Sequence, residues 1–502
     1  MIPQQSAYSF LQEELAEIEA QMLETEQLFQ RRLTDLPEDQ LQAARNLLHY
    51  LCLRSIDARQ LQDELHRVGL SSLASSESHI RSQIQAVRQL LGHSYSTADA
   101  EPCHYAFSSR NQLDNCIRLF GEPADAARPH IMVTFDSPFA TDEILIQDLL
   151  LKGMNIARIN CAHDHEVIWM DMIQNLKNAC AVTGKDCKLY FDLAGPKIRT
   201  RLIGKGMDAG KVRIQEGDLC WLCEKDALFS MDEIAIESSL PDIIRALKKG
   251  DRVFIDDGAI SAVVVSVEIN KAAIRIKQVS NPKQSIRSGK GMNFPDTNLN
   301  IPALTDFDRS CLPFILRHAD LIGCSFLRTA SDLKEIQQTL QSFNSGQPGM
   351  ILKIETAAAV QALPELLLQG MQMPPFGVMI ARGDLAVEIG FERLSEIQEE
   401  ILWLCEAAHV PVIWATQVLE NLGKSGLATR SEITDAGHAA VAECVMINKG
   451  AYVLRVISTL SDVLIKMSSH QKKKRYWFRK LNIADGFLSA NRVRPLIREL
   501  HR

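Results

Sequence analysis

Charged and polar side chains stand at the ends of several short apolar runs in this sequence. Arg158 and Asn160 end the run MNIARIN, and Asp192 ends the run KLYFD. Lys353 and Glu355 end the run MILKIE at alternate positions, which places both on one face of an extended strand. An ionisable pair that faces the interior of a fold is costly unless it binds something. The pattern therefore predicts a polar binding site inside an apolar framework.

Further groups of this kind follow the later runs. Asp384 follows the run GVMIA within the string ARGD, and Thr416 follows PVIWA. Two carboxylates, Glu355 and Asp384, suit a Mg²⁺ (or Mn²⁺) that is held by one or two carboxylates and by substrate oxygens. Phosphoryl transfer needs such a cation together with fixed positive charge, which Lys353 and Arg158 would supply. The alternative for any one of these residues taken alone is an ion pair within the fold.

The runs that carry these residues alternate with segments of helix length from residue 130 onward. Short apolar strands alternating with amphipathic helices are typical of βαβ units in a parallel sheet. Eight such strands predict an α/β fold, a closed (β/α)₈ TIM barrel with its active site at the C-terminal ends of the strands. The strand candidates are HIMVTF (from 130), MNIARIN (154), KLYFD (188), DLIGCSF (320), MILKIE (350), GVMIA (377), PVIWAT (411) and ECVMI (443).

One gap between strand candidates, from Asp192 to Asp320, is too long for a single helix. Within residues 202–296, alternating runs with turn residues predict an antiparallel β-domain. Inserted after the third barrel strand, this β-rich domain would overhang the mouth of the barrel as a lid. A CxxC pair, Cys220 and Cys223, lies within it. Because no second cysteine pair or histidine pair accompanies it, an ordinary strand is favoured over a metal or redox site.

The N-terminal part of the chain has a different pattern of apolar residues. Leu11, Leu15, Ile18 and Met22 recur at helical spacing, and similar stripes run through residues 41–53 and 80–91. We expect a helical bundle packed on the body, because the heptads are too short for a coiled-coil arm. The segment 92–129 is typical of a linker with one short helix. The predicted organisation is a helical region with linker (1–125), a barrel (126–201 and 297–470), a lid (202–296) and a basic-aromatic tail (471–502).

The composition excludes several classes of protein. The chain has 502 residues, a net charge of −7 and 46% hydrophobic residues, which is typical of a multidomain globular protein and argues against a nucleic-acid binder. No apolar run is long enough for a membrane-spanning helix, and the N-terminus lacks the layout of a signal peptide. The 12 cysteines have mostly apolar neighbours and no repeating spacing, which indicates reduced, buried thiols. We expect a cytoplasmic protein without nucleic-acid or membrane partners.

From about residue 130 to residue 455 the sequence resembles the pyruvate kinase family. The resemblance implies a Mg²⁺-dependent transfer of a phosphoryl group from phosphoenolpyruvate to ADP, giving pyruvate and ATP. The strings occur in family order and at family-like intervals. Four of them carry the resemblance: GMNIARIN (153–160), GPKIRT (195–200), LKIE (352–355) and VMIARGDL (378–385). Three others support it: VFIDDG (253–258), KGMNFP (290–295) and PVIWATQ (411–417).

The resemblance also implies roles for single residues. Glu355 and Asp384 would bind the divalent cation, and Lys353 would neutralise the phosphoryl group in flight. Thr416 would lie beside the substrate carboxylate and the enol carbon. The remaining expected contacts to substrate and phosphate are Arg158, Arg199, Lys290, His163, Gly383 and Ser325, and the monovalent-cation position would be marked by Asn160, Asp192 and Lys197.

The sequence departs from the family at the monovalent-cation position. The family has Asn-x-Ser where this chain has Asn160-Cys161-Ala162, so the hydroxyl is gone. Lys197 stands where the potassium-dependent members have Glu. A fixed ammonium near the position of the ion predicts activity that does not require K⁺.

Two loops depart as well. The segment TFDSP (134–138) replaces the family's Thr-Ile-Gly-Pro-Ala-Ser, where adenine-nucleotide contacts are expected, and the family's Ser-Gly-Glu-Thr is missing after Met446 and Ile447. An altered pocket and altered protonation of the enolate are the expected consequences. The family's C-terminal regulatory domain has no counterpart, so we expect no effector control through it. Family members are usually tetrameric partly through that domain, which leaves a smaller homo-oligomer or a monomer open.

Because of these departures, two alternatives to a pyruvate kinase-like enzyme stay open. One is a different metal-enolate enzyme on the same barrel, acting on another 2-oxo acid. The other is a catalytically weak scaffold or regulator whose N-terminal helices and basic tail bind partners. Taken by itself, the basic run from Lys472 to Lys480 is more typical of a solvated helix end than of a contact with lipid or RNA.

Overall fold

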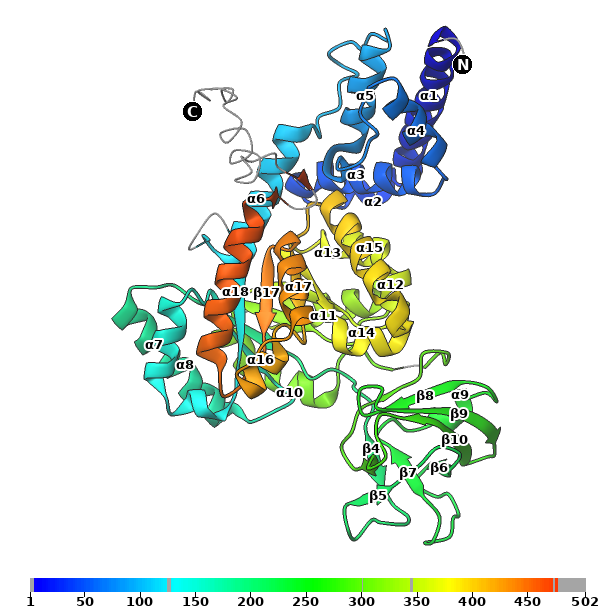
Figure 1. Ribbon diagram of the computed structural model, residues 1–502, viewed down its shortest axis with the longest axis vertical. Coiled ribbons are helices and arrows are strands. Elements are labelled where there is room, and N and C mark those ends of the chain that lie inside the picture. The colour runs from blue at the N-terminus through cyan, green and yellow to red at the C-terminus, as the bar shows by residue number, and fades with distance from the viewer. Residues whose placement is uncertain (1–3, 124–127, 300, 344–345, 473–474, 477–502) are drawn as a thin grey trace, which may run out of the picture.

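The computed structural model describes residues 4–123, 128–299, 301–343, 346–472 and 475–476 (Figure 1). Eight parallel strands close into a barrel, which confirms the predicted α/β fold class. Each predicted apolar run forms one of these strands, and the last pairs with the first. In barrel order they are β1 (His130–Phe135), β2 (Ile156–Asn160), β3 (Lys188–Asp192), β13 (Leu321–Cys324), β14 (Gly349–Ile354), β15 (Phe376–Ala381), β16 (Val412–Ala415) and β17 (Cys444–Ile447).

Both faces of the barrel strands are covered, which explains their continuous apolar runs. All six residues of β14 and of β15 are buried. The outward side chains, such as Leu352 and Val378, join one large cluster with the surrounding helices. The inward side chains, such as Ile351, Met379 and Ile413, form a separate cluster inside the barrel. Alternation along each strand thus divides one apolar run between two cores.

Helix α6 (Tyr105–Phe120) closes the N-terminal end of the barrel. Its last residues, Leu119 and Phe120, are buried in the same cluster as the inward side chains. Gly349 and Gly377 make room for them, because a Cβ at either position would lie 2.7 or 2.6 Å from a methyl group of Leu119. The segment predicted as a linker with a short helix therefore holds a helix of 16 residues that plugs the barrel.

Helices surround the barrel and connect its strands. Three of them begin with capping boxes, in which Thr305, Thr329 and Thr429 each bond the backbone of the residue three positions later. The surrounding helices are α7 (Glu143–Leu151), α8 (Glu166–Thr183), α10 (Asp306–His318), α11 (Ala330–Gln341), α12 (Ala357–Gln361), α13 (Leu363–Gly370), α14 (Arg382–Ile389), α15 (Leu394–Ala407), α16 (Glu420–Ser425), α17 (Arg430–His438) and α18 (Val453–Ser468). Short 3₁₀ turns are η2 (Ser137–Ala140), η3 (Phe391–Arg393) and η4 (Ala439–Val441).

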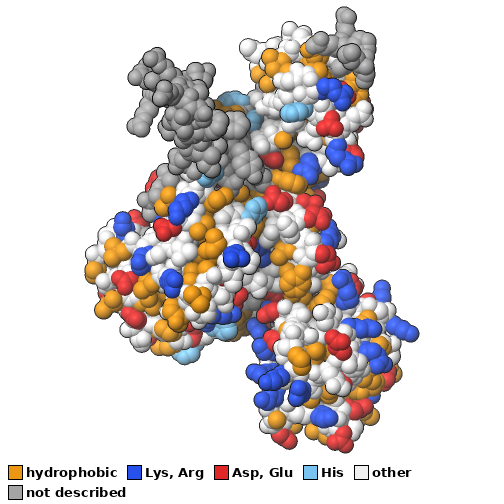
Figure 2. Space-filling view, in the orientation of Figure 1, with side chains coloured by type: hydrophobic (Ala, Val, Ile, Leu, Met, Phe, Trp, Pro, Cys, Tyr) orange, Lys and Arg blue, Asp and Glu red, His pale blue; other side chains and the backbone are white. Residues whose placement is uncertain are grey.

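The segment between β3 and β13 forms a β-rich lid domain with a core of its own. Its main sheet has seven strands in the order β12-β8-β9-β10-β6-β7-β4, and β5 pairs with β11. Figure 2 shows many Lys and Arg side chains on this domain. Its elements are β4 (Thr200–Leu202), β5 (Lys211–Arg213), β6 (Leu219–Cys223), β7 (Ala235–Ser238), α9 (Ile243–Ala246), β8 (Arg252–Ile255), β9 (Ile260–Val267), β10 (Lys271–Val279), β11 (Ser285–Arg287) and β12 (Met292–Asn293).

The CxxC pair lies in strand β6, as the sequence predicts for an ordinary strand. Cys220 and Cys223 are buried there as free thiols. Within the described residues no group of three or more His, Cys, Asp or Glu side chains could hold a metal ion. The two sulfurs are therefore part of the packing of the lid domain.

The N-terminal residues fold into a helical bundle at the end of the barrel opposite to the lid domain (Figure 1). Leu11, Leu15 and Met22 of the predicted stripe are fully buried in it. Asn46 fastens the bundle to the barrel, because its Nδ2 donates to the carbonyl oxygen of Ala407 at the end of α15 (2.8 Å). The same nitrogen donates to the carbonyl oxygen of Glu77 within the bundle (2.7 Å). The elements of the bundle are α1 (Gln4–Leu28), α2 (Gln30–Thr34), α3 (Glu38–Arg54), α4 (Arg59–Arg67), η1 (Glu77–His79) and α5 (Ile80–Leu90).

The predicted basic-aromatic tail lies mostly outside the described residues. Two short strands, β18 (Gln471–Lys472) and β19 (Arg475–Tyr476), pair at its start. Among the helices that the structure describes, none combines the length and the hydropathy needed to cross a membrane.

Candidate active site

A cavity of about 340 Å³ opens between the C-terminal ends of the barrel strands and the lid domain. Most of the predicted site residues line it: Arg158, Asn160, His163, Lys197, Arg199, Lys290, Lys353, Glu355, Asp384 and Thr416. The other three, Asp192, Ser325 and Gly383, lie behind this wall and hydrogen-bond to residues in it. The structure thus brings together side chains that are more than 200 positions apart in the chain.

The carboxylate of Asp192 organises the floor of the cavity. It is fully buried and accepts hydrogen bonds from Nε of Arg158 (3.0 Å) and from the hydroxyl of Tyr190 (3.1 Å). Nζ of Lys353 lies 3.3 Å away. Burial alone would raise the pKa of Asp192, but Lys353 and Arg158 lower it below its ordinary value. The group is therefore an anion that fixes two cations.

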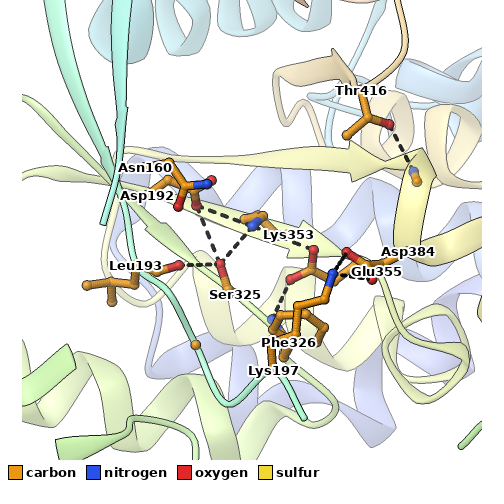
Figure 3. A network of polar contacts seen from close by, with 12 residues as sticks. Asn160, Asp192, Leu193, Lys197, Ser325, Phe326, Lys353, Glu355, Asp384 and Thr416 are labelled. Atoms are coloured by element: carbon orange, nitrogen blue, oxygen red, sulfur yellow. Dashed lines mark hydrogen bonds and ion pairs between the residues drawn. The ribbon is translucent and has the colours of Figure 1, made fainter. Parts of the chain in front are cut away.

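Lys353 is held between two carboxylates (Figure 3). Its Nζ donates to Oγ of Ser325 (2.7 Å) and lies 3.5 Å from Oε2 of Glu355. Burial lowers the pKa of Lys353, but Asp192 and Glu355 raise it above its ordinary value. The ammonium is therefore a fixed positive charge at the mouth of the barrel.

Glu355 and Asp384 form the predicted carboxylate pair. Oε1 of Glu355 accepts a hydrogen bond from the backbone N–H of Phe326 (2.6 Å). Burial raises the pKa of Glu355 to about 7; the nearby Lys353 opposes this rise and Asp384 adds to it. Two neighbouring carboxylates that repel each other favour a cation between them. The pair therefore fits a divalent cation that completes its shell with substrate oxygens.

Lys197 already places an ammonium in contact with one member of this pair. Its Nζ donates to both oxygens of Asp384 (2.9 and 3.1 Å) and lies 3.5 Å from Oδ1 of Asp257 in the lid domain. The sequence predicts Lys197 beside Asn160 and Asp192. The structure gives it other partners, because Arg158 and Lys353 hold Asp192. Lys197 instead connects the barrel to the lid domain.

Two more predicted phosphate contacts stand on the lid side of the cavity. Nζ of Lys290 lies 2.8 Å from Oδ1 of Asp256, and the Arg199 guanidinium donates to the carbonyl oxygen of Gly289 (3.0 Å). Both residues are partly exposed, so a bound anion can reach them and exchange for these partners. Their position predicts contacts to the phosphates of a nucleotide rather than to the buried end of a substrate.

The tip of the lid domain reaches the barrel. Asp256 and Asp257 have φ values of 60° and 53°, and Gly258 follows with 82°. A Cβ on Gly258 would lie 3.2 Å from a methyl group of Val387 in α14. Glycine therefore permits the close approach that keeps the lid against the helix that carries Asp384.

Thr416 sits on a strained segment directly after β16. Its φ is 63°, a value that β-branched residues rarely adopt. Its Oγ1 accepts a hydrogen bond from the backbone N–H of Gly383 (2.9 Å). Strain of this kind is typical of functional sites, where surrounding contacts impose the conformation. The hydroxyl is thereby fixed at the wall of the cavity.

Arg382 imposes that conformation, a role that the sequence does not reveal. Its Nε donates to the carbonyl oxygen of Ala415 (2.9 Å), and a second nitrogen donates to that of Thr416. The guanidinium lies 4.7 Å from the centre of the Trp414 ring, whose other neighbour is the His438 ring at 5.2 Å. The only sequence signal for Arg382 is the string ARGD, which also contains Asp384.

The two loops that depart from the family meet at the rim. Asp136 follows β1 and Lys449 follows β17, and their side chains form an ion pair of 3.8 Å. Burial and the nearby Lys449 lower the pKa of His163, which lines the cavity beside them. The histidine is therefore favoured as a neutral hydrogen-bonding group.

Comparison with known proteins gives one consistent result. The family description "Pyruvate kinase, barrel domain" matches residues 127–453, more than half of the chain. The chain is 31% identical over 326 residues to a pyruvate kinase of Geobacillus stearothermophilus, a match that covers 63% of this chain and 53% of that protein. It is 29% identical over 374 residues to pyruvate kinase 1 of Trypanosoma brucei brucei, covering 72% and 71%. The chain thus spans about half the length of the bacterial relative.

Proposed function

Because this chain belongs to the pyruvate kinase family, we propose that it transfers the phosphoryl group of phosphoenolpyruvate to ADP, giving pyruvate and ATP. One observation carries the proposal. Lys353 is fixed between Asp192 and Glu355, beside the carboxylate of Asp384, at the bottom of a cavity that basic side chains border on the lid side. Phosphoryl transfer depends on such positioning and fixed charge more than on covalent chemistry.

In the proposed reaction an oxygen of the ADP β-phosphate attacks the phosphorus of phosphoenolpyruvate. The bond from phosphorus to the enol oxygen breaks, and its electron pair stays on that oxygen. Lys353 stabilises the charge that spreads over the phosphoryl oxygens, because its ammonium is held in place before the substrate binds. Arg199 and Lys290 hold the nucleotide phosphates from the lid side.

Pyruvate forms when carbon 3 of the enolate takes up a proton. Thr416 is the proposed group that holds the proton donor, because its hydroxyl is fixed by Gly383 and lies at the cavity wall. The N-terminal turn of α14, which contains Gly383, would receive the substrate carboxylate, since helix N-termini bind anions.

Glu355 and Asp384 are the proposed ligands of Mg²⁺ or Mn²⁺. Such an ion, when bound, would act as a Lewis acid on the substrate oxygens. Lys197 would then share Asp384 with the ion, because its ammonium contacts both oxygens of that carboxylate.

The ammonium of Lys197 also supports activity without K⁺. It adds a permanent positive charge to the site through Asp384 and Asp257 rather than beside Asn160 and Asp192. The monovalent-cation position itself lacks a hydroxyl, because Ala162 replaces the family's Ser. We expect turnover with K⁺ to stay within about twofold of turnover with tetramethylammonium at the same ionic strength, since an ion pair within the chain is not exchanged with the buffer. Strong activation by K⁺ would contradict this part of the proposal.

The direct test is an assay coupled to lactate dehydrogenase, with Mg²⁺, phosphoenolpyruvate and ADP. Formation of pyruvate that depends on all three supports the proposal. Without turnover, Mg²⁺-dependent binding of oxalate, which mimics the enolate, would favour a different enzyme on the same barrel. The Asp136–Lys449 pair at the altered rim is the observation that motivates this second candidate. Loss of both turnover and oxalate binding would leave a non-catalytic role.

A further inference from the structure

Each of the two proposed metal ligands is in contact with an ammonium group of its own (Figure 3). Nζ of Lys353 lies 3.5 Å from Oε2 of Glu355, and Nζ of Lys197 donates to both oxygens of Asp384, at 2.9 and 3.1 Å. A divalent cation that binds this pair therefore meets two positive charges that are already in place. What happens to each ammonium decides how tightly the ion binds.

Lys353 has other partners, which hold it when the ion binds. Its Nζ donates to Oγ of Ser325 at 2.7 Å and lies 3.3 Å from the carboxylate of Asp192, which is fully buried. Removal of a cation from a buried carboxylate is strongly unfavourable, because the remaining charge is left uncompensated inside the protein. We therefore expect Lys353 to stay in its position.

Lys197 has no comparable second partner. Apart from Asp384, its only ion-pair contact among the described residues is with Oδ1 of Asp257 in the lid domain, at 3.5 Å. The side chain of Asp257 is 71% exposed, so water can readily take the place of the ammonium there. A divalent cation would itself compensate the charge of Asp384. Lys197 is thus the ammonium that the ion can displace.

The side chain of Lys197 stays at the cavity even when its ammonium leaves Asp384. A Cβ on Gly291 would lie 2.6 Å from Cε of Lys197, so the backbone of the lid domain packs directly against the stem of this lysine. Nζ also lies 5.8 Å from the centre of the Phe326 ring. Because Lys197 lines the cavity together with Arg199 and Lys290, an anionic substrate in that cavity can accept a hydrogen bond from its ammonium.

We propose that Lys197 takes the place of the divalent cation on Asp384 until a phosphorylated substrate binds. Before that point the ion has to displace the ammonium from at least one carboxylate oxygen, so its affinity is low. A phosphate group gives the ammonium another anion, and Asp384 then becomes available to the ion. Lys197 is in this respect a positioning residue that makes binding of the ion and of the substrate cooperative. The inference rests on the proposed assignment of Glu355 and Asp384 as metal ligands.

Binding of Mn²⁺ to the full chain tests this proposal without turnover, with the free ion measured by electron paramagnetic resonance. Lys197→Met removes the ammonium and keeps a side chain of similar length. We expect this variant to bind Mn²⁺ alone at least about tenfold more tightly than the unaltered chain, because a competing charge-assisted hydrogen bond is gone. Lys188→Met removes a lysine that pairs with Asp320 at the opposite end of the barrel, and this matched control should leave the affinity unchanged.

Phosphoenolpyruvate added without ADP tests the cooperativity. It should tighten Mn²⁺ binding in the unaltered chain by a factor that is at least about tenfold larger than the factor in Lys197→Met. Equal factors in the two proteins, or an unchanged affinity for Mn²⁺ alone in Lys197→Met, overturn the proposal. Lys197→Gln repeats both measurements with a polar side chain, and circular dichroism checks that each variant is folded.

Asp384→Asn separates this inference from the proposed function. It should abolish the Mn²⁺ binding that Lys197→Met strengthens. If Mn²⁺ binding depends on Asp384 but not on Lys197, the role inferred for Lys197 is wrong and the proposed metal site stands. If Mn²⁺ binding survives in Asp384→Asn, or if no variant binds the ion, the metal assignment fails and the role of Lys197 fails with it.

Discussion

The two ends of the barrel are built from the same eight strands and have opposite contents. At the N-terminal end the inward side chains are mostly apolar, and Leu119 and Phe120 of α6 close it. At the C-terminal end the same alternation brings charge inward. In β14 the inward face reads Ile351 and then Lys353, and Glu355 follows in line. Distance along a strand therefore decides whether an inward residue stabilises the fold or serves the site.

The largest expected effect is at the charged end. Lys353→Met should lower kcat of the proposed phosphotransferase by at least about 10³-fold, because it removes a preorganised charge from the transition state. The coupled assay measures kcat, and circular dichroism checks that the variant is folded. Full activity in a folded variant would reject the assignment of this site.

A substitution at the apolar end should act on stability instead. Leu119→Ala should lower the free energy of unfolding by about 3 kcal/mol, because it leaves a cavity between α6 and the starts of β14 and β15. Urea unfolding measures the loss. The value of kcat per folded molecule should stay unchanged. A drop in kcat comparable to that of Lys353→Met would contradict the assignment of stability to one end of the barrel and of catalysis to the other.

The apolar end should also be the source of one acid sensitivity. Burial lowers the pKa of His130 below its ordinary value of 6.5, although backbone carbonyls oppose this. As pH falls below 6.5, the histidine becomes protonated in the unfolded state but stays neutral in the folded state. The free energy of unfolding therefore decreases as pH falls below 6.5. His130→Gln should therefore flatten the decline of stability between about pH 7 and pH 5.5. Equal slopes in both proteins would show that other groups dominate.

The smallest effect is expected from a lysine at the rim of the same apolar end. Lys188 is half-exposed and lies 3.1 Å from Oδ1 of Asp320. Lys188→Met should change stability by about 1 kcal/mol or less and leave kcat intact. It is the matched control for Lys353→Met, since both replace a barrel lysine by the same residue at opposite ends.

Features that depend on local pattern could be predicted from the sequence. The eight barrel strands were recognisable because each is a short apolar run and most of the gaps between them have the length of a helix. The stripe from Leu11 to Met22 was recognisable because its period is helical. Lys353 and Glu355 were recognisable as neighbours because strand geometry fixes residues two apart on one face. These inferences need only a few consecutive residues.

Features that depend on distant partners could not be predicted. Nothing near Lys197 in the sequence indicates its contact with Asp384, because 187 positions separate them. The closure of the barrel by α6 was not predicted. Its two buried apolar residues, Leu119 and Phe120, are the last two residues of the helix, so they form no apolar stripe along it. Arg382 was missed for the same reason, since its partners Ala415 and Asp435 are supplied by later elements.

The position of Trp414 has a consequence for thermodynamics. Its ring contacts Arg382, which holds Thr416, and also contacts His438, which pairs with Glu399 of α15. If these rings transmit free energy between His438 and Thr416, the effect must act in both directions, because linkage between two equilibria is reciprocal. Filling the barrel mouth would then change the surroundings of His438, and a change at His438 would alter binding at the mouth.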